Sequence, residues 1–172
     1  MFFKPSVLRD QTIPSVNAPT LLQLTDGRLQ AMFRSKEERI VQAFSGDQGQ
    51  TWTELEASSL PNNNSGIEAL TLADGRHLLL YNHLSGEGQE DGWGKRNVLN
   101  LAISEDGREW KAAAIIEREE QGEFSYPAMI QTSDGLVHMT YTWNRRRVKH
   151  VTIDPRQLEA GRVIDLGPWD AP

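Results

Sequence analysis

Apolar and polar residues alternate along this chain in short runs of the kind that forms β-strands. Three pairs of such runs are joined by an Asp-Gly dipeptide, at Asp26-Gly27, Asp74-Gly75 and Asp134-Gly135. Asp-Gly between two apolar runs is a signal for a type I′ turn, so we predict three β-hairpins. The hairpins recur about every 50 residues, a period typical of repeat architectures built from short strands.

Further strands are expected between these hairpins, and little of the chain has helical periodicity. The additional strands are predicted at 39–44, 52–57, 98–103, 110–117 and 147–153. Residues 78–81 are apolar at every position, as in a sheet that is covered on both faces. We therefore predict an all-β fold, a β-propeller made of four-stranded antiparallel blades. The blades are expected at about 19–60, 61–118 and 119–154, after an irregular entry segment at 1–18 with room for one short strand and before a C-terminal tail at 155–172.

Two related turn sequences accompany the strands. The first, SGDQGQTW, occupies residues 45–52, and the second, SEDGREW, occupies 104–110. An Asp in such a loop can accept hydrogen bonds from nearby backbone N–H groups, and a Gly can adopt the positive φ that a tight reversal needs. The closing Trp can anchor the loop on a core. The shared positions are Ser45, Asp47, Gly49 and Trp52 in the first copy and Ser104, Asp106, Gly107 and Trp110 in the second.

The octet at 45–52 resembles the Asp-box of sialidases and related β-propellers, S-x-D-x-G-x-T-W, and matches it at every specified position. The resemblance implies a turn between the third and fourth strands of a blade. From about residue 18 to 154 the chain resembles the C-terminal half of sialidase-like (neuraminidase) BNR-repeat proteins, whose propellers have six blades. Three blades leave two open apolar faces, so we expect a homodimer or association with an N-terminal half. The alternative is a monomer in which Ile164, Leu166 and Trp169 of the tail cover an open blade.

Composition narrows the possible partners of the chain. Its 172 residues are 38% hydrophobic and 24% charged, which is typical of a globular protein. The net charge of −6 disfavours a nucleic-acid partner, because no basic face is available to neutralise phosphates. No apolar run reaches the length of a membrane span, so no membrane partner is expected. A cytoplasmic location is the default, and a secreted or periplasmic one stays open.

Tyr126 is the candidate nucleophile. It lies in the run Phe124-Ser125-Tyr126-Pro127-Ala128, which resembles the aromatic-small-Tyr-small-small segment that carries the nucleophilic Tyr of sialidases. A neutral phenol avoids the repulsion that a carboxylate nucleophile would meet at a sugar whose anomeric carbon bears a carboxylate. The alternative is a buried Tyr that packs beside Pro127.

The resemblance also implies partners for this Tyr. Glu68, in the apolar run 67–70, is the candidate activator, although the sialidase Glu aligns nearer Gly66. Asn82 stands where sialidases place an Arg of their substrate-binding triad, so we name it as a candidate substrate-binding residue, although an Asn cannot clamp a carboxylate as an Arg can. Arg96 is the candidate anion clamp, with a solvated loop residue as the alternative reading.

Metal and cofactor chemistry are not expected. The chain has no Cys, and its four His residues have no spacing typical of a metal site, so we predict neither a metal nor a cofactor. His83 and His150 end or cross strands near the proposed inner face, and we name both as candidate substrate-binding residues. A structural role is the alternative for each of them.

Two functional hypotheses follow from these observations. The first is a sialidase-like glycoside hydrolase that acts on a terminal, acidic sugar, with Tyr126 as nucleophile, Glu68 as its activator and Arg96 as the anion clamp. The second is a non-catalytic propeller segment that binds carbohydrate or another protein.

Overall fold

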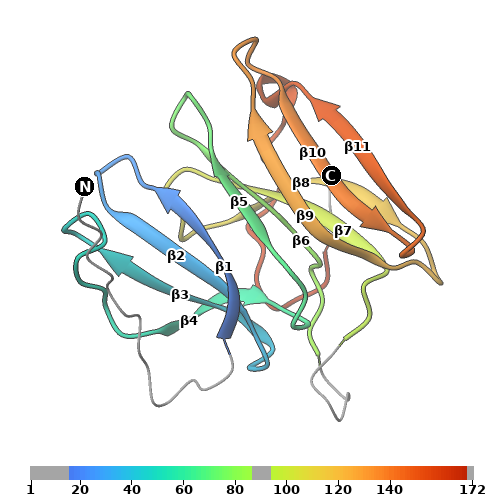
Figure 1. The fold of residues 1–172 in the computed structure, drawn as a ribbon, viewed down its shortest axis with the longest axis horizontal. Coiled ribbons are helices and arrows are strands. Elements are labelled where there is room, and N and C mark those ends of the chain that lie inside the picture. Colours follow the sequence, from blue (N-terminus) through green and yellow to red (C-terminus); the bar gives the residue numbers. More distant parts are fainter. Residues whose placement is uncertain (1–15, 87–93, 170–172) are drawn as a thin grey trace.

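The computed structural model describes residues 16–86 and 94–169, and these residues form an all-β fold of three antiparallel sheets (Figure 1). The predicted fold class is confirmed. The strands are β1 Val16–Gln23, β2 Leu29–Ser35, β3 Arg39–Ser45, β4 Glu56–Pro61, β5 Glu68–Thr71, β6 His77–Tyr81, β7 Val98–Ser104, β8 Lys111–Arg118, β9 Phe124–Gln131, β10 Val137–Trp143 and β11 Arg147–Ile153. A short 3-10 helix, η1, follows at Pro155–Gln157.

Each sheet is a simple meander of consecutive strands. The orders are β1-β2-β3-β4, β5-β6-β7-β8 and β9-β10-β11, so the third sheet has one strand fewer than the others. Strand β1 begins at Val16, within the entry segment in which we allowed one short strand, and residues 1–15 of that segment lie outside the described part of the chain. The long loop expected at 85–94 is described only at its two ends.

The first strands of the three sheets lie next to one another, as the inner strands of propeller blades do (Figure 1). The backbone N–H of Ala69 on β5 donates to the hydroxyl of Thr20 on β1 at 3.0 Å. After β5, the N–H of Ala73 donates to the side-chain oxygen of Gln131 on β9 at 2.8 Å. Side-chain to backbone hydrogen bonds therefore join neighbouring sheets along their inner edges.

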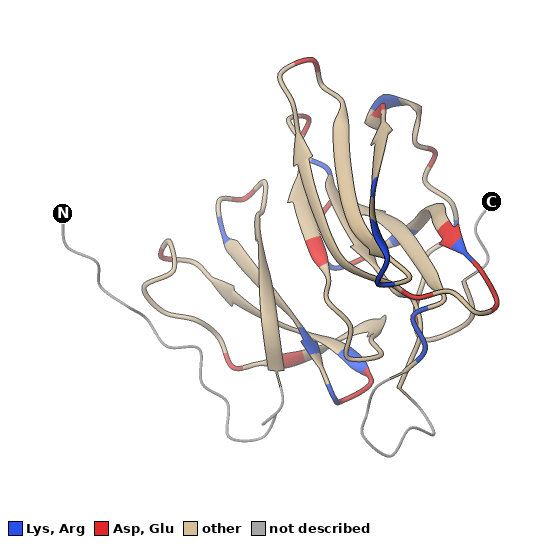
Figure 2. Cartoon of the chain, turned by 45° about the vertical axis from the view of Figure 1, so that its right-hand side comes forward, with Lys and Arg blue, Asp and Glu red and all other residues tan. Residues whose placement is uncertain are grey.

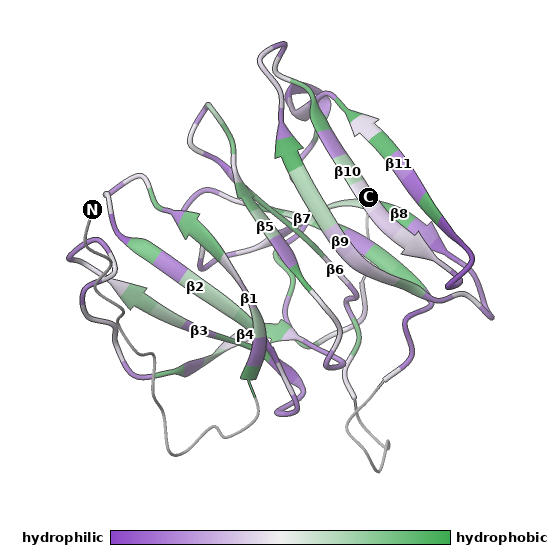
Figure 3. Cartoon of the chain, viewed as in Figure 1, coloured by the Kyte–Doolittle hydropathy of each residue, from purple (hydrophilic) through white to green (hydrophobic). Residues whose placement is uncertain are grey.

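The second sheet is buried on both faces, which explains its unbroken apolar runs. On β6, Leu79 and Tyr81 pack toward the first sheet, whereas Leu78 and Leu80 pack toward the third. All four side chains have no exposed surface. Apolar residues therefore follow the strands in Figure 3, while the charged residues in Figure 2 lie mostly in turns and loops.

The far face of the third sheet is open. Ile130 and Val148 project from it with 60% and 73% of their surface exposed. The tail, described as far as Trp169, does not cover this face over those residues. Instead, it returns to the second sheet, where Ile164 is buried together with Trp169 in the core between the first two sheets, while Leu166 is 48% exposed.

The three Asp-Gly hairpins use a different turn from the predicted one. At the first, the N–H of Gly27 donates to the carbonyl of Leu24 at 2.9 Å, and only the Gly has a positive φ, of 86°. This is a type I turn followed by a glycine bulge, and the same pattern recurs at Gly75 and Gly135. The type I′ prediction is therefore wrong here, because Asp26 keeps a negative φ and lets its side chain accept from the N–H of Arg28.

The first Asp-box connects β3 to β4 and is closed by side-chain hydrogen bonds. The carboxylate of Asp47 accepts from the Thr51 N–H at 2.8 Å, from the Thr51 hydroxyl at 2.6 Å and from the Ser45 hydroxyl at 2.8 Å. The Ser45 oxygen in turn accepts from the N–H of Gly49. These bonds lower the pKa of Asp47 to about 2. Trp52 packs against the core of the first sheet.

The second Asp-box connects β7 to β8 and also joins two sheets. Asp106 accepts from the backbone N–H groups that follow it, and Trp110 is buried with 1% of its surface exposed. The carbonyl of Gly107 accepts from the side chain of Gln30 on β2 at 2.8 Å. This turn therefore buttresses the first sheet against the second.

Candidate functional site

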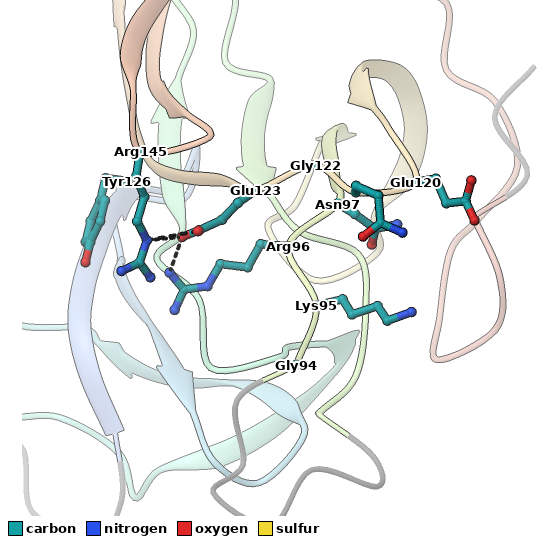
Figure 4. A pocket seen from close by; sticks show the side chains of 10 residues that line it. Gly94, Lys95, Arg96, Asn97, Glu120, Gly122, Glu123, Tyr126 and Arg145 are labelled. Atoms are coloured by element: carbon teal, nitrogen blue, oxygen red, sulfur yellow. Dashed lines mark hydrogen bonds and ion pairs between the residues drawn. The ribbon is translucent and has the colours of Figure 1, made fainter.

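A cavity of about 540 Å³ lies where the connections into β7 and β9 meet the β10–β11 turn (Figure 4). Two segments line it, residues 94–97 before β7 and residues 120–123 before β9. Two further residues complete the lining, Tyr126 on β9 and Arg145 in the β10–β11 turn. The structure therefore brings two predicted site residues, Tyr126 and Arg96, to one cavity.

Tyr126 is held in an unusual conformation at the rim of this cavity. Its φ is +54°, in the left-handed region that non-glycine residues rarely adopt. The pairing of β9 with β10 shifts register here, since Ser125 pairs with Thr142 whereas Ala128 pairs with Thr140. A bulge of this kind re-aims a side chain, and strained residues cluster at functional sites. The expected alternative, a buried Tyr beside Pro127, does not fit a side chain that is 65% exposed.

Two guanidinium groups meet one carboxylate in the cavity. Arg96 approaches Glu123 with an Nη1 to Oε1 distance of 3.7 Å, and the Nε of Arg145 lies 2.7 and 2.9 Å from the two carboxylate oxygens (Figure 4). Arg96 is only 11% exposed, Glu123 is 31% exposed and Arg145 is 71% exposed. Hydrogen bonding to Glu123 raises the pKa of Arg145 further above its usual value.

The turn that carries Arg145 is fixed to the loop before β9. Asn144 and Arg145 both have positive φ, of 51° and 50°, and they form a type I′ turn. The Asn144 side chain accepts from the N–H of Glu123 at 2.6 Å, and its backbone N–H donates to the Glu123 carbonyl at 2.7 Å. The indole N–H of Trp143 donates to Glu119 at 3.3 Å. This turn is therefore an ordered wall of the cavity.

Glu68 lies apart from Tyr126. Its carboxyl is half-buried on β5, and burial raises its pKa, although a hydrogen bond from the backbone N–H of Met129 opposes the rise. Met129 is three residues beyond Tyr126 on β9. The residue beside Tyr126 is Gly66, where an added Cβ would lie 3.9 Å from the Tyr126 Cα. Among the described residues no hydrogen bond joins Glu68 to Tyr126.

Asn82 and His83 occupy buried structural positions outside the cavity lining. The Asn82 amide donates to the carbonyls of Val98 and Phe124, and so links the second sheet to the third. The Nε2 of His83 lies 2.8 Å from the Gly167 carbonyl, which can only accept, so Nε2 carries the proton and Nδ1 accepts from the Tyr81 hydroxyl. Burial lowers the pKa of His83.

His150 lies on the open face of the third sheet, beside a separate cavity of about 360 Å³. Its ring stacks on that of His138, with 3.0 Å between the Nε2 of His150 and the Nδ1 of His138. Across residues 16–86 and 94–169, His, Cys, Asp and Glu residues form no group of three or more that could hold a metal ion. Within the same ranges, no helix is long and apolar enough to span a membrane.

Sequence reasoning missed Glu123 and Arg145. The three consecutive arginines at 145–147 look like a solvated hairpin tip, because the sequence does not show that the first of them folds back over the loop before β9. The sequence signal that could have identified the pair is Glu123, an acidic residue at the end of the loop before β9. Two segments that flank the same strand pair, with opposite charges, are candidates for an ion pair.

Comparison with known proteins agrees with the architecture. A family model described as a BNR repeat-like domain matches residues 6–139. Among solved structures, a sialidase from Streptococcus pneumoniae is 16% identical with a TM-score of 0.62, and the match covers 86% of this chain and 25% of that one. An intramolecular trans-sialidase from Ruminococcus gnavus is also 16% identical, with a TM-score of 0.64, over 84% of this chain and 34% of that one.

The chain is similar to the same degree to a glycosidase of a different specificity. An α-L-arabinofuranosidase from Fusarium graminearum is 18% identical with a TM-score of 0.61, over 94% of this chain and 50% of that one. The chain thus spans between a quarter and half of the length of these proteins, and at such identities the likeness shows a shared fold. A search of curated protein sequences found no match.

Proposed function

The chain belongs to the BNR repeat-like domain family, and from this membership we propose that it forms part of a sialidase-like glycoside hydrolase that acts on a terminal, acidic sugar. The observation that carries the proposal is the exposed, left-handed Tyr126 at the rim of a cavity that also contains the partly buried Arg96. A nucleophile beside a cation suits a substrate that carries a negative charge near its reacting carbon.

In the proposed reaction the phenol oxygen of Tyr126 attacks the anomeric carbon, and the leaving oxygen departs with the electron pair of the broken bond and is protonated by water. A water molecule then attacks the anomeric carbon and breaks its bond to the Tyr126 oxygen, which releases the free sugar and restores the phenol. The phenol proton passes to Glu68, whose raised pKa suits a group that accepts a proton. Because Glu68 contacts the Met129 N–H rather than Tyr126, this transfer needs a bridging water or sugar hydroxyl. Arg96 holds the negative group of the sugar.

The second candidate function is carbohydrate binding without catalysis. The observation that favours it is Gly66, which puts no acidic side chain against Tyr126. In that case Tyr126 serves as an exposed aromatic surface for a sugar ring, and Arg96 recognises the anionic group as before.

Hydrolysis and binding measured together separate the two candidates. Aryl sialosides and aryl uronides release a weakly basic phenol that leaves without a general acid, so they report on the nucleophile alone. Hydrolysis that falls at least a hundredfold in Tyr126→Phe supports the enzyme. Saturable binding of the free acidic sugars, with no turnover by the native protein, supports the binding protein. Hydrolysis at equal rates in the native protein and Tyr126→Phe would remove Tyr126 from the mechanism.

We further propose that the open face of the third sheet packs against another set of blades, either from a second copy of this chain or from a separate N-terminal half. Ile130 and Val148 would then be buried, and each buried apolar side chain stabilises the contact by about 1.5–3 kcal/mol. Light scattering after size-exclusion chromatography tests the homodimer. The mass should be twice the 19.4 kDa of one chain and should fall to that of one chain in Val148→Asp. A native mass of one chain would rule out the homodimer.

A further inference from the structure

The open face of the third sheet is uncharged at its centre, and the sheet lies at one end of the row of sheets (Figure 1). From Ala128 onward on β9, and throughout β10 and β11, the side chains that alternate with the buried core residues are Ala, Ile, Thr, Val and His. All of these strand residues lie in the described part of the chain. Two copies of this face can therefore meet without repulsion between like charges.

The far face of the first sheet, at the other end of the row, offers a poorer surface for such a contact. Leu21 on β1 is exposed there, but the apolar residues of β2 and β3 on that face are at most 6% exposed and form a buried cluster with Leu55. A closed ring of two copies would require this covered face to meet the open one. The open face is therefore better suited to a copy of itself, in an isologous dimer.

Two histidines lie among the exposed apolar residues of the open face. His138 pairs with Ile130 across β9 and β10, and His150 follows Val148 by two positions on β11. The Nδ1 of His138 and the Nε2 of His150 are 3.0 Å apart while the ring centres are 5.2 Å apart, so the two nitrogens point toward each other. Two imidazole nitrogens on one tetrahedral Zn²⁺ are about 3.3 Å apart. A small opening of the pair would therefore admit the ion.

A zinc ion would replace the hydrogen that the two nitrogens share. A neutral imidazole has one N–H, which either ring nitrogen can carry. Both rings stay neutral in the bound state, with the proton of His138 on Nε2 and that of His150 on Nδ1. The Thr152 hydroxyl lies 3.4 Å from the Nδ1 of His138, so a further polar group borders the pair. One chain thus supplies two of the four ligands that a closed zinc site needs.

We propose that Zn²⁺ joins two copies of this chain through the open face of the third sheet, with His138 and His150 of each copy as its four ligands. Sheets that pack face to face are about 10 Å apart, so an ion midway between them is about 5 Å from each, within reach of an imidazole. Ile130 and Val148 of both copies pack around the ion. The inference rests on the packing of this face against a second copy, put forward above, and not on the hydrolase.

Light scattering after size-exclusion chromatography, in EDTA and in ZnCl₂, tests the proposal. We expect Zn²⁺ to lower the dissociation constant of the dimer at least tenfold, and calorimetric titration to give one Zn²⁺ for every two chains. MgCl₂ is the matched control, because Mg²⁺ prefers oxygen ligands and should not change the dissociation constant.

His138→Gln and His150→Gln test the ligands. Each variant removes two of the four ligands of the dimer, so each should abolish the effect of Zn²⁺ while the mass in EDTA stays that of the native protein. The double variant retains His77 and His83. A zinc effect that persisted in the double variant would come from other groups and would overturn the assignment.

The remaining outcomes separate this inference from the other proposals. A dimer that is equally stable in EDTA and in ZnCl₂ would leave the packing of the open face standing and overturn the zinc site. One Zn²⁺ per chain, with the mass of a single chain, would overturn the bridged dimer. The hydrolase is tested separately by the activity of Tyr126→Phe, so its failure leaves the zinc site intact.

Discussion

Gly66 lies against the backbone of Tyr126, and a Cβ added to Gly66 would lie 3.9 Å from the Tyr126 Cα and 3.8 Å from the Pro127 Cδ. These are ordinary van der Waals distances, so the position has room for a side chain. Gly107 differs sharply, because a Cβ there would lie 2.3 Å from the Gln30 side-chain oxygen and 2.8 Å from the Leu24 Cδ2.

Alanine substitutions at these two glycines should therefore have different effects. We expect Gly66→Ala to change the free energy of unfolding by less than about 1 kcal/mol. Gly107→Ala should cost roughly 2–4 kcal/mol, because its φ of +72° is unfavourable for alanine and its Cβ would displace Gln30 from its contact with the turn. Urea denaturation measures both values. Equal costs would show that Gly107 is not a close-packed contact.

Asp47 should make stability depend on pH in the acid range. Its hydrogen bonds to Thr51 and Ser45 lower its pKa from 3.8 to about 2, so the unfolded state takes up a proton first as the pH falls. The stabilisation is present above about pH 4 and is lost between about pH 4 and pH 2. Thermal unfolding of Asp47→Asn should show a lower midpoint at pH 7 and a flatter acid limb than the native protein. Glu54→Gln, at an exposed neighbour, should change neither.

His83 should make the packing of the tail depend on pH near neutrality, at a higher pH than Asp47. Burial lowers its pKa below 6.5, so the unfolded state binds the proton more readily and stability falls as the pH drops through about 6.5. Protonation would force a second N–H against the Tyr81 hydroxyl and charge a buried ring beside Trp169. Hydrogen exchange at the Ile164 N–H should therefore speed up at pH 5 relative to pH 7.5, after correction for intrinsic rates.

Two variants check the assignment to His83. His83→Gln should reduce the pH dependence of exchange at Ile164, whereas His150→Gln, which alters an exposed imidazole, should leave it intact. If the pH dependence of exchange at Ile164 were unaltered in His83→Gln, a group other than His83 would cause it. His77 would be the next candidate, because burial lowers its pKa too.

Asn82 should be intolerant of an isosteric acid. Its amide donates to two carbonyls, so Asn82→Ala loses two buried hydrogen bonds and should destabilise the protein by about 1–3 kcal/mol. Asn82→Asp should cost more, because a carboxylate would face the same two carbonyl oxygens. Asn97→Asp makes the same change at the cavity lining, and we expect a smaller cost there. Denaturant midpoints compare the three variants.

The architecture could be predicted because it depends on local patterns. Alternation, Asp-Gly turns and the two Asp-boxes mark where strands begin and end, and the unbroken apolar run of β6 marks a sheet buried on both faces. Turn type was harder to predict. Asp-Gly allows a type I turn with a glycine bulge as well as a type I′ turn. The type I′ turn of the structure lies at Asn144-Arg145, which contains no glycine and so carries no clear sequence signal.

The candidate site was only partly predictable, because it depends on contacts between segments. Tyr126 and Arg96 share a cavity, and Gly66, just before β5, lies beside Tyr126 in place of Glu68, as the alignment of the sialidase Glu nearer Gly66 indicated. A strand offset of two residues keeps the same face and leaves the hydrophobic pattern unchanged. Asn82 was named for its alignment with a triad Arg and His83 for its place at a strand end, and neither signal distinguishes a residue that meets a ligand from one that meets another part of the chain.

Because the tail returns to the second sheet, the core between the first two sheets can be completed only after the third sheet has been synthesised. Residues 161–164 pair with the start of β8, where the Ile164 N–H donates to the Trp110 carbonyl at 2.9 Å, and about 50 residues of chain separate the two partners. Closing so long a loop is slow relative to forming a hairpin. During synthesis on the ribosome, the third sheet can form as soon as β11 emerges, but the core between the first two sheets waits for Trp169. A nascent chain halted before that residue would leave this core incomplete, and incomplete cores of this kind are prone to aggregate.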